Sequence, residues 1–332
     1  MSQNSYILLE VFVYARSCCF SSGGPEVLEY KEVPTPEVKP GWSRIKVAGF
    51  GINHSEIFTR EGQSPSVHFP RILGIEAVGT IDATSDPVHL PVGQKVISIM
   101  GEMGRDFDGS YAEYALLPNI QLYPVETSLS WKDLAAIPET YYTAFGIFNS
   151  FQLKPTDSVL VRAATSGVGV AVMQLAKGRY PAIKVTGTTR NPAKSQQLLK
   201  AGFDDVVVTP DANQLPDYVG SFDKIADLIG PSATRDSLQH LNEFGIVSVT
   251  GELGGVWTLD GFDPIMDIPN NRYLTGFYSG DVSQTQIQAM LDFIAHHHID
   301  VSPIKVFDLP HIADAHRYLE SQSSFGKVVV LN

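Results

Sequence analysis

A glycine-rich turn between a strand and a helix is the clearest chemical signal in the sequence. Residues 159–177 read VLVRAATSGVGVAVMQLAK, an apolar run followed by a helical pattern. Such a turn directs backbone N–H groups, and the positive end of the helix dipole, at a bound pyrophosphate. The fingerprint positions hold Ala164, Ser166 and Gly169 instead of three glycines, so the turn alone also fits a plain structural helix start. The flanking elements favour a dinucleotide site formed by Ser166, Gly167, Val168 and Gly169.

The end of the next strand indicates which dinucleotide binds. A site for NAD normally carries Asp or Glu about 20 residues after the turn, where it holds the ribose 2′-OH. Residues 186–194 read TGTTRNPAK and contain no carboxylate. Thr189, Arg190 and Lys194 could instead hydrogen-bond and neutralise a 2′-phosphate. The alternative is a pair of ordinary solvated surface charges. We predict NADPH as the cofactor.

Strands and helices alternate through the middle of the chain. The expected strands are residues 158–162, 184–188, 205–208, 224–227 and 246–250, and the expected helices are 169–177, 192–201 and 232–242. This alternation is typical of a doubly wound parallel sheet, which makes the chain an α/β protein.

The two ends of the chain differ from its middle. Short β-type runs at residues 27–33, 43–48, 77–81, 95–100 and 111–117 are separated by Gly and Pro and predict an antiparallel, barrel-like domain. Helices at 284–297 and 312–320 and a strand at 327–331 should rejoin it. We therefore expect one domain from residues 1–128 and 280–332, and a nucleotide-binding domain over 129–279. Residues 11–22 form either a hairpin or a loop.

Bulk properties exclude several classes of protein. At 332 residues the chain suits two domains, and its net charge of −12 disfavours nucleic acid as a partner. No apolar run is long enough for a membrane span, and the N-terminus lacks a signal-peptide pattern, so the expected location is cytoplasmic. Cys18 and Cys19 are adjacent and should remain reduced thiols.

Taken together, these segments resemble the quinone oxidoreductase branch of the medium-chain dehydrogenase/reductase superfamily. The motifs that carry the resemblance are GPEVL at 24–28, GINHSE at 51–56, PRILGIEAVG at 70–79, DGSYAEY at 108–114, residues 163–177 and FGKVV at 325–329. The resemblance implies a GroES-like catalytic domain, a Rossmann domain, an active site in the cleft between them, and a homodimer formed through an edge strand at 272–278.

The resemblance also implies roles for single residues. Asn53 would lie near the nicotinamide and the substrate, with Glu56 at the position of the family's acidic residue, although Asn53 could simply cap a helix. Phe58 stands where many relatives carry a tyrosine. Tyr142, or its neighbour Tyr141, therefore becomes a candidate proton donor, with water as the alternative. The residues implied to line the cofactor are Thr143, Gly251 and Phe277, the last of which could be plain core.

The residue types argue against a metal site. Zinc dehydrogenases need Cys or His ligands, but Asn53 and Ile75 occupy the positions where the family's zinc enzymes carry them. No cysteine follows Cys19. Residues 296–298 are three histidines at the end of an expected helix, where adjacent side chains do not converge.

Without a Lewis acid, a carbonyl must be polarised by hydrogen bonds alone, which suits activated electrophiles. We therefore predict an NADPH-dependent oxidoreductase that transfers hydride to a quinone or an α,β-unsaturated carbonyl compound. A 2-alkenal or enoyl double-bond reductase is the alternative enzyme. A non-catalytic NADPH-binding protein is disfavoured by the charge and by the complete set of cofactor motifs.

Overall fold

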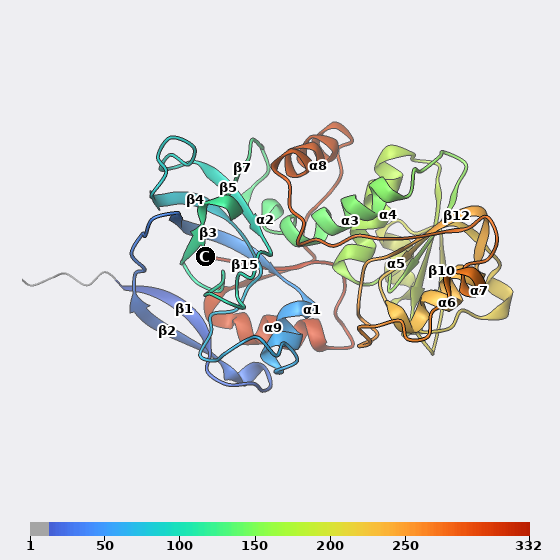
Figure 1. Cartoon of the computed structure of the whole chain (residues 1–332), viewed down its shortest axis with the longest axis horizontal. Coiled ribbons are helices and arrows are strands. Elements are labelled where there is room, and N and C mark those ends of the chain that lie inside the picture. The colour runs from blue at the N-terminus through green and yellow to red at the C-terminus, as the bar shows by residue number, and fades with distance from the viewer. Residues whose placement is uncertain (1–12) are drawn as a thin grey trace, which may run out of the picture.

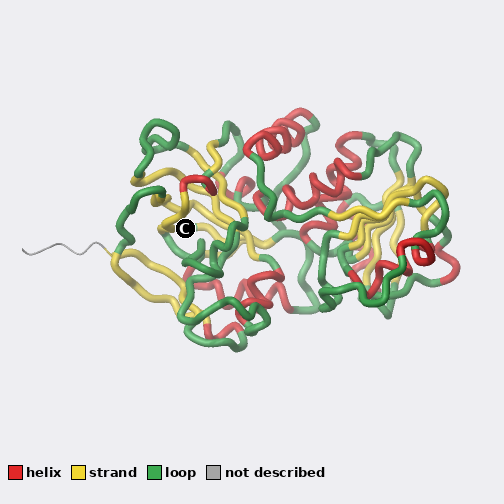
Figure 2. The backbone as a smooth tube through the Cα atoms, viewed as in Figure 1, coloured by secondary structure: helices red, strands yellow, loops and turns green. Residues whose placement is uncertain are grey.

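Two β-sheets organise the computed structural model, which describes residues 13–332 (Figure 1). Their strands form two separate groups in opposite halves of the molecule, with helices around and between them (Figure 2). One sheet is parallel throughout and the other is mainly antiparallel. This confirms the predicted α/β class with its two kinds of sheet. Within residues 13–332, no helix combines the length and apolarity needed to cross a bilayer.

The parallel sheet has the strand order β10-β9-β8-β11-β12-β13. Its strands are β8 (Ser158–Arg162), β9 (Lys184–Thr189), β10 (Asp205–Val208), β11 (Phe222–Asp227), β12 (Leu241–Val249) and β13 (Tyr273–Gly276). The helices associated with it are α4 (Gly167–Arg179), α5 (Ser195–Ala201), α6 (Pro231–Gln239) and α7 (Pro264–Asp267). Val159, Leu160 and Val161 are fully buried, as expected for a central strand covered on both faces.

The largest difference from the predicted bounds in this sheet lies between α6 and β12. The helix expected at 232–242 ends at Gln239, and β12 begins at Leu241 rather than at Ile246. The pairing of β12 with β11 slips between Phe222↔Leu241 and Lys224↔Ile246. The residues of β12 between Leu241 and Ile246 are not paired regularly with β11. Their sequence therefore lacks the apolar pattern by which a strand is predicted.

The antiparallel sheet has the order β14-β15-β3-β4-β5-β7, with β6 also paired to β3. Its strands are β3 (Trp42–Ile52), β4 (Glu76–Thr84), β5 (Lys95–Ile99), β6 (Tyr114–Pro118), β7 (Tyr123–Pro124), β14 (Lys305–Asp308) and β15 (Val328–Leu331). β15 pairs with β3 from Val328↔Ile52 to Leu331↔Gly49, so the end of the chain lies in the sheet built by its first third. The domain boundaries at 128/129 and 279/280 stay a prediction.

The segment at residues 11–22 forms a hairpin over its described part. β1 (Val13–Cys19) pairs with β2 (Leu28–Pro34) from Val13↔Pro34 to Cys19↔Leu28. Residues 11 and 12 lie outside the described part of the chain. Cys18 and Cys19 are buried free thiols, as expected.

Four helices lie beside the antiparallel sheet and between the two halves. They are α1 (His54–Arg60), α2 (Trp131–Leu134), α3 (Pro138–Ser150) and α8 (Gln284–His296). Of these, only α8 was predicted, and it ends one residue early. α1 and α2 are too short to show a helical period, and the run of α3 from Thr140 to Ile147 is buried on all sides, which removes the amphipathic pattern.

A buried polar cluster joins α1 to α9 (Ile312–Glu320). Arg60 is 1% exposed and donates to both carboxylate oxygens of Glu320, at 2.7 and 3.0 Å. It also donates to Nδ1 of His316 at 3.1 Å, so the proton of the ring lies on Nε2, which is 2.9 Å from the hydroxyl of Tyr111. Burial, and then the Arg60 charge, lowers the pKa of His316 to about 3.

This cluster predicts that the free energy of unfolding falls at acidic pH. Because the folded-state pKa of His316 lies below its unfolded value of about 6.5, its contribution is complete above that pH and is lost as the pH falls toward 3. We expect the stability advantage of the wild type over His316→Gln to shrink by up to about 1.4 kcal/mol per pH unit below about 6.5. Urea unfolding at several pH values measures this. His68→Gln, at an exposed histidine outside the cluster, is the control. A pH-independent difference for His316→Gln would contradict the prediction.

Candidate active site

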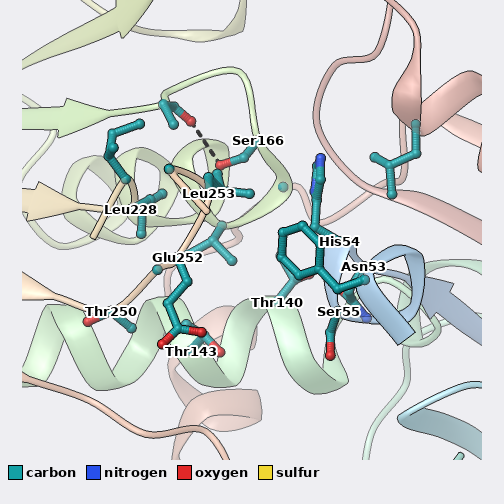
Figure 3. A pocket seen from close by; sticks show the side chains of 18 of the residues that line it. Asn53, His54, Ser55, Thr140, Thr143, Ser166, Leu228, Thr250, Glu252 and Leu253 are labelled. Carbon is teal, nitrogen blue, oxygen red and sulfur yellow. Dashed lines mark hydrogen bonds between the residues drawn. The ribbon is translucent and has the colours of Figure 1, made fainter. Parts of the chain in front are cut away.

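A cavity of about 1580 Å³ lies between the two sheets and is lined by residues from both. Asn53, His54 and Ser55 reach it from the start of α1, and Thr140 and Thr143 from α3 (Figure 3). The opposite wall carries Ser166 from the glycine-rich turn, Leu228 after β11, and Thr250, Glu252 and Leu253 after β12. The cavity exceeds an ordinary small-molecule site of about 300–1,000 Å³ and is large enough for a dinucleotide with a second ligand.

The glycine-rich turn has the geometry of an anion cradle. Ser166 caps α4 by accepting a hydrogen bond from Gly169 N at 3.1 Å, while its hydroxyl donates to Ala163 O at 2.8 Å. Ala163 adopts a left-handed conformation with φ of 58°. A Cβ on Gly169 would lie 2.8 Å from Ala163 O, so this position needs glycine. The free N–H groups at the start of α4 thus fit a pyrophosphate.

Two cations lie together at the end of β9. Thr189, Arg190 and Lys194 all line the cavity, and Lys194 donates from Nζ to Ser324 O at 2.6 Å. Burial, and then the charge of Arg190, lowers the pKa of Lys194. Two neighbouring cations without a carboxylate between them make a site suited to a phosphate dianion.

A buried network holds the side chain of Asn53. Lys327 lies 2.7 Å from both Asn53 Oδ1 and Glu76 Oε1, and Asn53 Nδ2 donates to the same Glu76 oxygen at 2.8 Å. An ammonium can only donate and a carboxylate can only accept, so these partners determine which end of the amide is oxygen. The second N–H of Asn53 Nδ2 stays available to a ligand.

Residues of α3 extend this hydrogen-bond network. Glu139 N donates to Glu76 Oε2 at 2.7 Å, and Thr143 Oγ1 donates to Glu139 Oε1 at 2.9 Å. Burial raises the pKa of Glu139. The Thr143 side chain therefore has a fixed rotamer where it meets the cavity, and Figure 3 shows Glu252 directed toward it.

Comparisons with known proteins agree with this geometry. Residues 39–127 match the alcohol dehydrogenase GroES-like domain, and residues 201–330 match the zinc-binding dehydrogenase family. A Homo sapiens protein named quinone oxidoreductase is 30% identical over 246 residues, covering 71% of this chain and 73% of its own length. A Pseudomonas aeruginosa quinone oxidoreductase is 25% identical and covers 93% of this chain and 97% of its own length. A mycobacterial protein solved as a complex with NADPH shares the fold with a TM-score of 0.78 at 24% identity, covering 96% of this chain and 100% of that chain.

The chain belongs to the quinone oxidoreductase-like family of medium-chain dehydrogenases/reductases. It is therefore an oxidoreductase with a GroES-like domain and a nucleotide-binding Rossmann-like domain, as the sequence predicted. The fold of this family binds pyridine nucleotides.

Most of the site residues predicted from the sequence line the cavity. Those that line it are Asn53, Thr143, Ser166, Gly167, Val168, Thr189, Arg190, Lys194, Gly251 and Phe277. Gly169 lies behind the turn, where it allows the close approach of α4. Phe277 packs over Gly146 of α3, which has no side chain to obstruct the ring.

Glu56 is not among the cavity-lining residues. Its carboxylate accepts hydrogen bonds from Asn53 N at 3.2 Å and Ile75 N at 3.4 Å, so it stabilises the start of α1. Burial, followed by the nearby Glu76, raises the pKa of Glu56 to about 8. The structure therefore places Glu56 behind Asn53 and away from the cavity, and its predicted catalytic role stays a prediction.

The two tyrosines also lie away from the cavity. The hydroxyl of Tyr142 lies 2.9 Å from Asp281 O and 2.8 Å from Gln286 Oε1, either of which can accept its single proton, and Tyr141 donates to Gln174 Oε1 at 2.6 Å. Both tyrosines are buried, and their hydroxyl groups connect α3 to α4 and α8. The prediction of Tyr142 as proton donor does not fit this geometry.

Several residues at the site had no predicted role. Lys327 lies in the FGKVV motif and Glu76 in the PRILGIEAVG motif. A lysine directly before a buried apolar strand was a signal that could have pointed to the hydrogen-bond network around Asn53. Phe58 of α1 meets Trp257, which follows β12, edge to face across the cavity with ring centroids 5.4 Å apart. No local pattern in the sequence pairs these two rings.

The geometry of the turn predicts the effect of a single methyl group. Gly169→Ala would place a Cβ against the backbone of Ala163 and Ala164, which cannot move without opening the turn. We expect weaker nucleotide binding, by at least about tenfold, and a loss of about 1–3 kcal/mol in stability from overpacking. Gly178→Ala in the same helix is the matched control, because its Cβ would meet side-chain atoms of Ile299 and His297 and no backbone atom, with Ile299 Cδ1 nearest at 2.8 Å. Calorimetry and thermal unfolding would contradict the prediction if both variants behaved alike.

Proposed function

We propose that this oxidoreductase is a zinc-independent, NADPH-dependent reductase of a quinone or a related activated carbonyl compound. The observation that carries the proposal is the fixed orientation of Asn53, with Oδ1 on Lys327 and Nδ2 on Glu76. The remaining N–H of Nδ2 can donate to a substrate carbonyl and stabilise negative charge that develops on its oxygen. The names of the relatives support a quinone as acceptor.

NADPH would be held by three groups of residues. The N–H groups at the start of α4 would receive the pyrophosphate, and Arg190 and Lys194 the 2′-phosphate. Thr143, Gly251 and Phe277 would line the nicotinamide end. When bound, the cofactor supplies a hydride from its nicotinamide ring.

Zinc independence rests on the residue types at the cavity. Asn53 replaces a thiolate ligand and already has both ends of its amide engaged with Glu76 and Lys327. Among residues 13–332, no cluster of three or more His, Cys, Asp or Glu side chains is arranged to hold a metal ion. Hydrogen bonding by Asn53 would take over the polarisation of the carbonyl.

The proton that completes the reduction would come from water, since Tyr141 and Tyr142 are engaged elsewhere. A 2-alkenal or enoyl reductase would use the same machinery on a carbon–carbon double bond, so only the acceptor distinguishes the two. The homodimer and the cytoplasmic location stay predictions.

The proposal is tested by NADPH oxidation with metal-stripped protein, using a 1,4-quinone and a 2-alkenal as parallel acceptors. We expect turnover without added zinc. Asn53→Ala should lower kcat/KM about 10–100-fold, because it removes a hydrogen bond to developing charge, while the Kd for NADPH stays within about twofold. An inactive wild type that binds NADPH tightly would contradict the proposed reaction and favour a non-catalytic binding protein.

Cofactor choice gives a separate prediction. Arg190→Ala should raise the KM for NADPH about 10–100-fold and leave that for NADH nearly unchanged, because only NADPH carries the phosphate. Lys200→Ala, an exposed lysine on α5 outside the cavity, is the control for the loss of one positive charge. A preference for NADH in the wild type that survives Arg190→Ala would refute the assignment.

A further inference from the structure

One cation at the cavity has no role in the proposed reaction. Arg105 lines the cavity and donates from Nη2 to Ser55 Oγ of α1 at 2.7 Å. Its Nη1 lies 3.9 Å from the carboxylate of Glu102, beyond hydrogen-bonding distance, and its Nε has no hydrogen-bond partner. The Arg105 side chain is 22% exposed. One hydrogen bond leaves most of its five N–H donors unused.

The backbone beside Arg105 is held in an unusual conformation. Met100, Gly101 and Glu102 are consecutive left-handed residues with φ of 55°, 61° and 66°. The loop is fixed by the fully buried Met103 and by hydrogen bonds from the N–H groups of Arg105 and Asp106 to Glu102 O. Left-handed non-glycine residues cost free energy and are concentrated at functional sites. The loop thus places Arg105 rather than leaving it to sample solvent.

The other cations of the cavity are committed to other ligands. Lys327 is paired with Glu76, and Arg190 and Lys194 lie together at the end of β9. Arg105 lies in the loop between β5 and β6 of the antiparallel sheet and contacts α1, at whose start Asn53 offers the proposed donor to the acceptor carbonyl. One helical turn beyond Ser55, Phe58 meets Trp257. Arg105 therefore lies with the groups that surround the acceptor, not with those that hold the cofactor.

We propose that Arg105 binds an anionic group on the hydride acceptor, so that the substrate is an unsaturated carbonyl compound carrying a carboxylate. This inference rests on the proposed function and specifies its substrate class. Ser55 orients the guanidinium, and the Phe58–Trp257 pair forms an apolar wall for the rest of the molecule. A carboxylate suits the site better than a phosphate, because a phosphate carries nearly two charges, whereas here a single cation lies near the acidic Glu102.

The test uses an acid and its neutral ester as matched acceptors, 3-benzoylacrylate and its methyl ester. We expect the wild type to prefer the acid in kcat/KM. Arg105→Gln should lower kcat/KM for the acid about 10–100-fold and change it less for the ester, so that the ratio between them falls. Arg235→Gln, which removes an equal charge outside the cavity, should preserve the ratio.

Binding of the saturated products, 3-benzoylpropionate and its methyl ester, is measured by calorimetry in the presence of NADP⁺ and does not depend on turnover. An acid preference that disappears in Arg105→Gln supports the inference even if no acceptor is reduced, in which case only the proposed reaction fails. Equal acid-to-ester ratios in the wild type and Arg105→Gln overturn the inference while leaving the reductase intact. Should Arg105→Gln unfold, Arg105→Lys retains the charge but not the planar fork, and must show a reduced acid preference for the inference to stand.

Discussion

The buried contact between Lys327, Glu76 and Asn53 is the constraint on which the site depends. Glu76 is fully buried and Lys327 is 7% exposed, so neither charge can be satisfied by water. Isolated charges at such depth would be very costly, and here each is paired and hydrogen-bonded. The contact joins the end of the chain to the start of β4, the start of α1 and, through Glu139 N, to α3. Four segments distant in sequence are thereby fixed relative to one another.

The same C-terminal segment also reaches the parallel sheet. Gly326 N donates to Thr165 O in the glycine-rich turn at 2.9 Å, and Ser324 O accepts from Lys194. Residues 324–327 therefore connect the cradle at α4, the cation pair at β9 and the Asn53 network. Because β15 pairs with β3, the residues just before β15 can contact both walls of the cavity.

Burial raises the pKa of two acidic groups near the cavity. The pKa of Glu56 is raised to about 8 and that of Glu139 is also raised, although Lys327 lowers both. The net charge of the chain is −12, yet four cations, Arg105, Arg190, Lys194 and Lys327, line the cavity. Such a distribution suits an anionic cofactor, since low-dielectric walls strengthen the attraction of a few cations.

Local sequence was sufficient for features that depend on neighbours in the chain. Residues 158–162 were predicted as a strand with the observed bounds, because an apolar run followed by small residues must end in a tight turn. The cofactor residues from Ser166 to Lys194 follow from that same local unit. Helix α3 was missed because burial on every side removes its helical period. Glu56 and Tyr142 lie away from the cavity, which the sequence could not show, because hydrogen-bond partners such as Ile75 and Asp281 come from distant segments. Sequence by itself determined the family, the sheet types and the nucleotide turn. The tertiary structure alone decided which polar groups face the cavity, since that depends on long-range packing that pairs Lys327 with Asn53 and Arg105 with Ser55.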